Sequence, residues 1–282
     1  QAATTDDFMR AMSDAGGIDL NQFRRWYEQA GTPNLRVEER YENATLTLSI
    51  EQSCPPTPGQ DQKLPFHMPV LIGLLGGDGQ DLAITANQLV TEAEVELRDN
   101  NGSVMVNLRE PTTQLAFTGL TEKPVVSFLR QFSAPVKVQY DRPAAELDFL
   151  ARHDQDGFVR WDAMQSMWMS YFDRGGSETD ARPQDAVHSI AEQALTLSRS
   201  DEKLLAATML TVPGELYLFE QLQGFDALGL LDARDAGVAL VATQSVELWQ
   251  TLYETYAARD GHQVDADSIA ARALANIGFN YW

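Results

Sequence analysis

The sequence predicts a mixed, multi-domain protein: a short helical segment, an immunoglobulin-like β-sandwich and an α-helical superhelical array. Two changes of hydrophobic period carry this prediction. Apolar residues recur at helical spacing over residues 1–33, alternate with polar residues over 34–142, and return to helical spacing over 143–282. We therefore expect three segments with these boundaries.

Residues 1–33 predict two short helices. Thr5 or Asp6 is a candidate N-cap of the first helix, and we expect the second to begin at Asp19 and to close at Gly31 and Pro33.

The two helices carry bulky apolar stripes that include Phe8, Met12, Phe23 and Trp26. Since two short helices cannot bury such stripes against each other alone, we expect them to be the trailing edge of a domain whose body lies elsewhere.

Residues 34–142 predict short strands. Leu46, Leu48 and Ile50 alternate with Thr and Ser, which is typical of a strand with one wet face. The run Asp-Asn-Asn-Gly at 99–102 is a hairpin signal between the apolar runs that flank it. Seven or so such strands over about 110 residues have the proportions of an immunoglobulin-like sandwich.

Residues 143–282 predict successive helices, which favours a stacked α-superhelix. Pro143 suits a first helical position. Helical runs are expected near 187–197, 201–211, 214–223, 226–259 (with a break) and 265–282. The Met/Trp-rich segment 164–169 is either core or an adaptable binding groove.

Charge and composition exclude several classes of protein. The net charge is −20, with 12 basic against 19 acidic residues over 1–142 and 9 against 22 over 143–282, so nucleic-acid binding is disfavoured. No apolar run approaches the roughly 20 residues that span a bilayer. Cys54 is the single cysteine, which fits a reducing, cytoplasmic environment. Without an initiator Met, the chain is expected to be an interior piece of a longer one.

A search for catalytic chemistry finds no complete site. The four histidines, His67, His153, His188 and His262, form no HExxH motif, and GxSxG and GK[ST] are absent. The acidic run 154–165 places Gly at the fourth position and Gln at the twelfth, where a calcium loop needs Gly at the sixth and Glu at the twelfth. We expect a helix-to-helix turn there.

One run resembles a known family. The segment FRRWYEQAGTP at 23–33, followed at once by an alternating strand, resembles the end of the catalytic domain in the bacterial aminopeptidase N family, HExxH zinc metallopeptidases. Stretches QAATTDDF at 1–8, FSAPVK at 132–137, RWDA at 160–163 and RALAN at 272–276 are similar to successive parts of that family, in order.

The resemblance implies a parent enzyme that hydrolyses N-terminal residues from peptides, with zinc bound in a catalytic domain that this chain lacks. It implies no catalytic, cofactor or metal residue here, and an inactive chain when isolated. Trp26, Gln29, Gly31 and Pro33 would form the joint between catalytic domain and sandwich. The expected partners are peptide substrates and the missing catalytic domain, with neither nucleic acid nor membrane.

In this interpretation the sandwich is a spacer and the helical array covers the catalytic cleft. The alternative is a stand-alone binding or scaffold protein that uses the Met/Trp-rich helical face.

Overall fold

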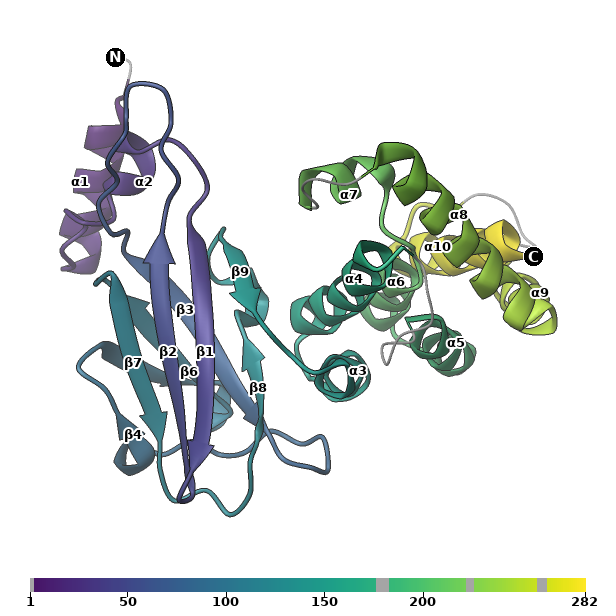
Figure 1. The fold of residues 1–282 in the computed structure, drawn as a ribbon, viewed down its shortest axis with the longest axis horizontal. Helices are drawn as coiled ribbons and strands as arrows, with labels where there is room; N and C mark the ends of the chain where they lie inside the picture. The colour runs from purple at the N-terminus through teal and green to yellow at the C-terminus, as the bar shows by residue number, and fades with distance from the viewer. Residues whose placement is uncertain (1–2, 176–182, 222–225, 258–262) are drawn as a thin grey trace. The chain divides into compact units, whose positions relative to one another are not determined.

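A computed structural model describes residues 3–175, 183–221, 226–257 and 263–282 (Figure 1). The chain forms two compact units, Gln1–Asp141 and Arg142–Trp282, which are described separately. His262, the end of the predicted run 214–223 and the end of the predicted run 226–259 lie outside the described residues.

The first helix, α1 (Thr5–Gly16), begins one residue earlier than predicted. Its N-cap is Thr4, whose hydroxyl accepts from the backbone N–H of Asp7 at 3.2 Å while the Asp7 carboxylate accepts from the Thr4 N–H at 3.0 Å. This reciprocal capping box satisfies two N–H groups at once. Gly17, at φ 62°, ends the helix in the left-handed region.

The prediction of a second helix from Asp19 is wrong, because α2 covers only Arg25–Glu28. The Asp19 carboxylate accepts from the backbone N–H of Asn21 at 2.8 Å, and such a local side-chain bond favours a turn over a helix. Residues 21–24 accordingly form turns.

The β-sandwich consists of two sheets, and the predicted fold class is confirmed (Figure 1). One sheet has the order β4 (Leu89–Val90), β7 (Thr112–Phe117), β2 (Thr45–Ser53), β1 (Asn34–Glu42) and β9 (Lys137–Tyr140). The other has the order β5 (Glu94–Arg98), β6 (Ser103–Leu108), β3 (Met68–Leu75) and β8 (Val125–Phe128). The paired strands are antiparallel except β1 and β9, which run parallel. Short 3₁₀ turns lie at Ala86–Gln88, Asp99–Asn101 and Arg130–Phe132.

The alternating strands fill the sandwich core as their period predicts. Leu46, Leu48 and Ile50 are at most 1% exposed. The expected hairpin is also confirmed, since β5 and β6 pair with Arg98 opposite Ser103 across the 99–102 turn. Asn100 there has φ 54°, a value that Asn tolerates better than most residues.

The second unit is helical. Its elements are α3 (Ala144–His153), α4 (Gly157–Asp173), α5 (Pro183–Ala194), α6 (Ser200–Met209), α7 (Glu215–Gln221), α8 (Ala227–Gln244), α9 (Val246–Tyr256) and α10 (Ala266–Tyr281). The predicted break in 226–259 falls at Ser245, where φ is −155° and ψ 58°. Pro143 is the N-cap of α3, one residue before the predicted position.

Helix α4 supplies the centre of this unit. Met164, Met167 and Trp168 are at most 1% exposed, and the Trp168 ring stacks on Phe172 at 5.4 Å. Of the two interpretations of segment 164–169, these side chains form core and not an exposed binding groove, so the scaffold alternative gains no surface from them.

No helix in the described parts of the chain is long and apolar enough to cross a bilayer.

Candidate functional site

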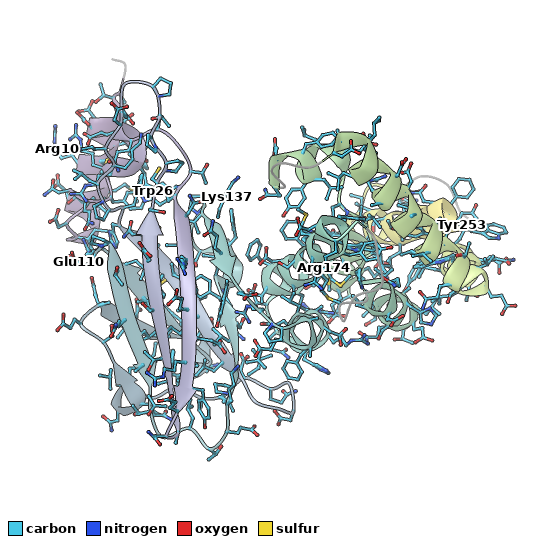
Figure 2. The ribbon with its side chains drawn as sticks, in the orientation of Figure 1. Arg10, Trp26, Glu110, Lys137, Arg174 and Tyr253 are labelled. Atoms are coloured by element: carbon cyan, nitrogen blue, oxygen red, sulfur yellow. The ribbon has the colours of Figure 1, made fainter. Side chains whose placement is uncertain are left out.

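The predicted joint lies where α1 and α2 meet one end of the sandwich, and Trp26 lies between these helices and the strands (Figure 2). The Trp26 indole N–H donates to the backbone carbonyl of His67 at 2.9 Å. Its ring packs on Phe66 with centroids 4.8 Å apart. Trp26 therefore ties α2 to the segment that leads into β3.

Gln29 makes a reciprocal pair with the same segment. Its amide N–H donates to the carbonyl of Leu64 at 2.9 Å, and its carbonyl accepts from the Leu64 N–H at 2.7 Å. This imitates the exchange of two hydrogen bonds between paired strands.

Gln52 of β2 also bonds to the segment that leads into β3. Its amide accepts from the Phe66 N–H at 2.7 Å and donates to the carbonyls of Phe66 at 3.0 Å and Glu110 at 2.9 Å. Gln22 adds a bond to the carbonyl of Arg109 at 2.7 Å. Neither Gln22 nor Gln52 is predicted from the sequence, because a glutamine carries no local signal for partners so distant in sequence.

Gly31 and Pro33 carry the chain from the helices into β1. Gly31 has φ 97°, and a Cβ there would meet the Cys54 sulfur at 3.2 Å and the Thr57 methyl at 3.3 Å. Pro33 is buried, and its carbonyl accepts from the Lys137 N–H at 2.9 Å at the start of parallel β9. The structure thus brings all four predicted joint residues to one end of the sandwich.

Several large apolar side chains of residues 3–33 are exposed. Phe8, Met12, Ile18 and Tyr27 are between 51% and 56% exposed, whereas Phe23 and Trp26 are half-buried against the sandwich. Large apolar side chains left exposed within one short segment are typical of an interaction surface.

Neither the described histidines nor the acidic turn form a metal site. No group of three or more His, Cys, Asp or Glu in the described residues could hold a metal ion. His67 pairs with the Asn107 amide at 2.9 Å, and His188 pairs with the Ser245 hydroxyl at 2.6 Å. Asp156 caps α4 by accepting from the Val159 N–H at 3.0 Å, which is the expected helix-to-helix turn.

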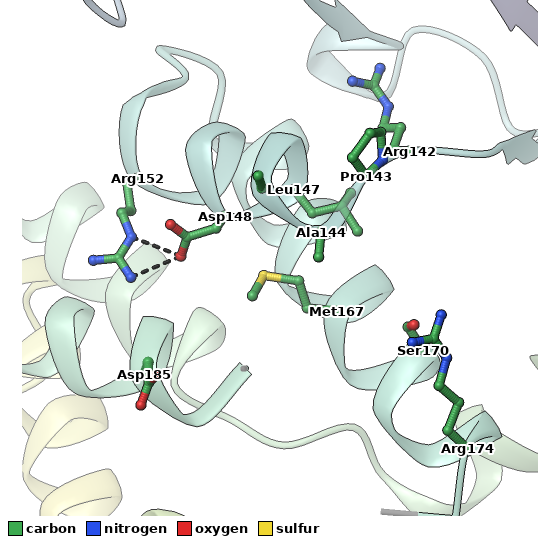
Figure 3. Close-up of a pocket in the computed structure, with 11 residues that line it drawn as sticks. Arg142, Pro143, Ala144, Leu147, Asp148, Arg152, Met167, Ser170, Arg174 and Asp185 are labelled. Carbon is green, nitrogen blue, oxygen red and sulfur yellow. Dashed lines mark hydrogen bonds and ion pairs between the residues drawn. The ribbon is translucent and has the colours of Figure 1, made fainter. Parts of the chain in front are cut away.

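The helical unit contains a cavity of about 630 Å³ along α3, α4 and α5 (Figure 3). Asp148 and Arg152 form an ion pair at 2.8 Å on its wall, and Ser170 and Arg174 project from α4. Arg142 lies 4.0 Å from Glu146. The lining holds three arginines, Arg142, Arg152 and Arg174, against Asp148 and Asp185, so its formal charge is close to neutral.

A second cavity of about 480 Å³ lies between α4, α6, α7 and α10. Trp161 and Tyr217 line it with their rings 6.4 Å apart, and the remaining lining is mostly apolar.

Two family models match the chain. Residues 31–141 match a domain of unknown function, DUF3458, with an Ig-like fold, and residues 144–282 match DUF3458_C, described as ARM repeats.

Three curated relatives carry the name aminopeptidase N. The protein from Escherichia coli is 32% identical over 98% of this chain and 31% of its own length. That from Haemophilus influenzae is 30% identical over 100% and 32%, and that from Caulobacter vibrioides is 31% identical over 98% and 30%. The chain therefore spans about a third of the length of these relatives.

A solved structure shares the fold. The crystal structure of Legionella pneumophila aminopeptidase A in complex with aspartic acid superposes with a TM-score of 0.78 at 20% identity, over 99% of this chain and 31% of that one. Along its whole length the chain is homologous to bacterial aminopeptidase N, and it includes an Ig-like domain over residues 31–141 and an ARM-repeat domain over residues 144–282.

Proposed function

We propose that the chain is the non-catalytic portion of a zinc-dependent aminopeptidase that removes N-terminal residues from peptides. The observation that carries the proposal is the joint: Trp26 and Gln29 hold α2 to the sandwich, while Phe8, Met12, Ile18 and Tyr27 of the same segment are exposed. We assign residues 1–33 to the end of the catalytic domain, 34–142 to the sandwich and 143–282 to the first part of the helical domain.

In this proposal the catalytic zinc and the groups that activate water belong to the catalytic domain. Trp26, Gln29, Gly31 and Pro33 fix the angle at which that domain meets the sandwich. The sandwich is a spacer. The helical domain covers the catalytic cleft and restricts entry to peptides. The excess of acidic residues over 143–282, 22 against 9 basic, would steer cationic peptide N-termini. The enzyme would be cytoplasmic, since a single cysteine suits a reducing compartment.

A chimera tests the proposal. The corresponding region of the Escherichia coli relative is replaced by this chain, and hydrolysis of alanine p-nitroanilide is measured. We expect an active chimera, and we expect the Phe8→Asp/Met12→Asp pair to abolish activity by charging the covered face.

The matched control is Val90→Asp, which charges a side chain that is 59% exposed on β4, away from the joint. A folded but inactive chimera, or one in which both sets of substitutions act alike, would contradict the proposal.

A further inference from the structure

The second cavity of the helical unit, between α4, α6, α7 and α10, is a groove with an uncharged wall. The described residues that line it include no acidic or basic side chain. A charged group that entered such a groove would lose hydration without gaining an opposite charge, which is costly. The groove therefore favours an uncharged ligand.

Most of this wall is apolar. Leu204, Val212 and Ile277 supply aliphatic surface. The hydroxyls of Thr208 and Thr211 each donate to the backbone carbonyl four residues earlier, at 2.8 and 2.9 Å, so both are already engaged within the chain. The volume of about 480 Å³ is of the size that small-ligand sites occupy.

One polar side chain of the wall lacks a partner. Gln165 of α4 is 5% exposed, and its amide makes no hydrogen bond with any described residue. Its amide atoms are not sealed off by protein, and the groove is the opening that it lines. Gln52, the other buried glutamine of the described residues, uses both of its amide atoms, at 2.7 to 3.0 Å. Because a buried polar group without a partner costs stability, such groups are rare in proteins.

A peptide unit has the groups that match the Gln165 amide. Its N–H donates to a glutamine carbonyl while its C=O accepts from the glutamine N–H. Gln29 makes this same exchange with the backbone of Leu64, at 2.9 and 2.7 Å. A peptide that lies in the groove can therefore satisfy Gln165 with a single backbone unit.

The end of the groove suits an aromatic side chain. The Trp161 and Tyr217 rings lie 6.4 Å apart, with their planes inclined by 59°. Burial, and to a smaller extent the Asp162 charge, raises the pKa of the Tyr217 hydroxyl, which agrees with a poorly hydrated end. A further ring gains there from leaving water and from packing against two aromatic partners.

We propose that this groove binds a peptide through an aromatic side chain, with the ring against Trp161 and Tyr217 and the adjoining peptide unit hydrogen-bonded to the Gln165 amide. This deepens the proposed function, on which it rests, because it names the class of peptide that the helical domain holds.

Indole NMR on the 282-residue chain tests the inference. The five tryptophans give five indole N–H signals, and the signal absent from Trp161→Phe identifies Trp161. The probes are three blocked peptides, acetyl-Ala-Xaa-Ala-amide with phenylalanine, lysine or glutamate at Xaa. We expect the phenylalanine peptide to shift the Trp161 signal and to bind at least about tenfold more tightly than either charged peptide, because only its side chain gains from leaving water.

The variant Gln165→Met keeps the length of the side chain and removes its amide. Binding of the phenylalanine peptide should weaken by roughly three- to tenfold, because one or two hydrogen bonds are lost. The Tm of the helical unit should rise by about 2–5 °C, because no unpaired amide remains. The control is Gln193→Met, the same change at an exposed position of α5, which should leave both quantities unchanged. Tyr217→Leu should weaken binding by roughly three- to tenfold.

Several results would overturn the inference. These are an unshifted Trp161 signal, equal binding of a charged peptide, and a Gln165→Met variant that binds as tightly as the unmodified chain or that loses binding together with stability. So would a Trp161 signal that moves with protein concentration alone, since a second copy of the chain would then be the occupant. The test measures binding without hydrolysis, so an active chimera with no binding refutes only the groove, and binding with an inactive chimera refutes only the proposed function.

Discussion

Replacing Asp81 by Asn should destabilise the sandwich through Arg130, whose side chain is 5% exposed. The two groups form a bidentate pair, with Nη2 at 2.6 Å from Oδ1 and Nη1 at 2.9 Å from Oδ2. Nε also donates to the Ser127 hydroxyl at 2.6 Å, so the guanidinium joins β8 to the turn after β3. It packs so closely on Gly73 that a Cβ there would lie 2.2 Å from Cζ.

Breaking a buried ion pair by removing one partner costs about 3–5 kcal/mol, because the remaining charge is left uncompensated. Asp81 is 25% exposed and Arg130 keeps its hydroxyl acceptors, so we expect the lower end, about 3 kcal/mol. For a domain of this size, each kcal/mol shifts Tm by roughly 3 °C. Differential scanning calorimetry should therefore show the sandwich transition about 9 °C lower, with the helical unit unaffected.

The control is Glu38→Gln, which breaks the Arg36–Glu38 pair, 2.8 Å apart with both side chains more than 60% exposed. That change should cost less than about 0.5 kcal/mol. The double variant Asp81→Asn/Arg130→Met should lose less than the sum of its two single variants, since no buried charge remains. A Tm for Asp81→Asn within about 2 °C of the unmodified chain would refute the reasoning.

Two further predictions concern Gly31 in the joint and Asp162 on α4. Gly31→Ala should destabilise the sandwich unit by about 1–2 kcal/mol, because φ 97° strains an L-residue and the new Cβ would meet the Cys54 sulfur at 3.2 Å. Calorimetry should show a smaller loss of stability for Gly59→Ala, where φ is 76° but nothing lies within 4 Å of a Cβ. Equal losses would show that the contact with Cys54 contributes nothing. Asp162→Asn should stabilise the helical unit at pH 7, because the native state raises the pKa of Asp162 from 3.8 to about 6 and so disfavours the charge. That advantage should shrink as pH falls from about 6 to below 3.8, where Asp162 is neutral in both states; urea titrations at pH 7 and pH 4 that show no such convergence would contradict it.

Local signals account for much of the agreement between sequence and structure. The Asp265 side chain caps α10 by accepting from the Ser268 N–H at 3.0 Å, and Asp226 caps α8 by accepting from the Leu228 N–H at 3.2 Å. Both helices were predicted to begin at these residues. Because each N-cap acts within three residues of sequence, the start of the helix can be recognised without the tertiary structure.

Contacts between distant segments explain the wrong prediction of a helix from Asp19. Phe23, Trp26 and Tyr27 have helical spacing, yet residues 21–24 form turns. The bonds that Gln22 makes, to the carbonyls of Pro65 at 3.2 Å and Arg109 at 2.7 Å, replace helical regularity with contacts to the sandwich. Tertiary contacts of this kind override a local preference.

The sequence alone determined the order of the three segments, the fold class of each unit and the similarity to bacterial aminopeptidase N, because hydrophobic period and short motifs are properties of neighbouring residues. Only the tertiary structure decided that Met164 and Trp168 are core, that Gln52 and Arg130 hold the sandwich from within, and that Trp161 on α4 faces Tyr217 on α7. These depend on which distant segments pack together, and no pattern of neighbouring residues records that choice.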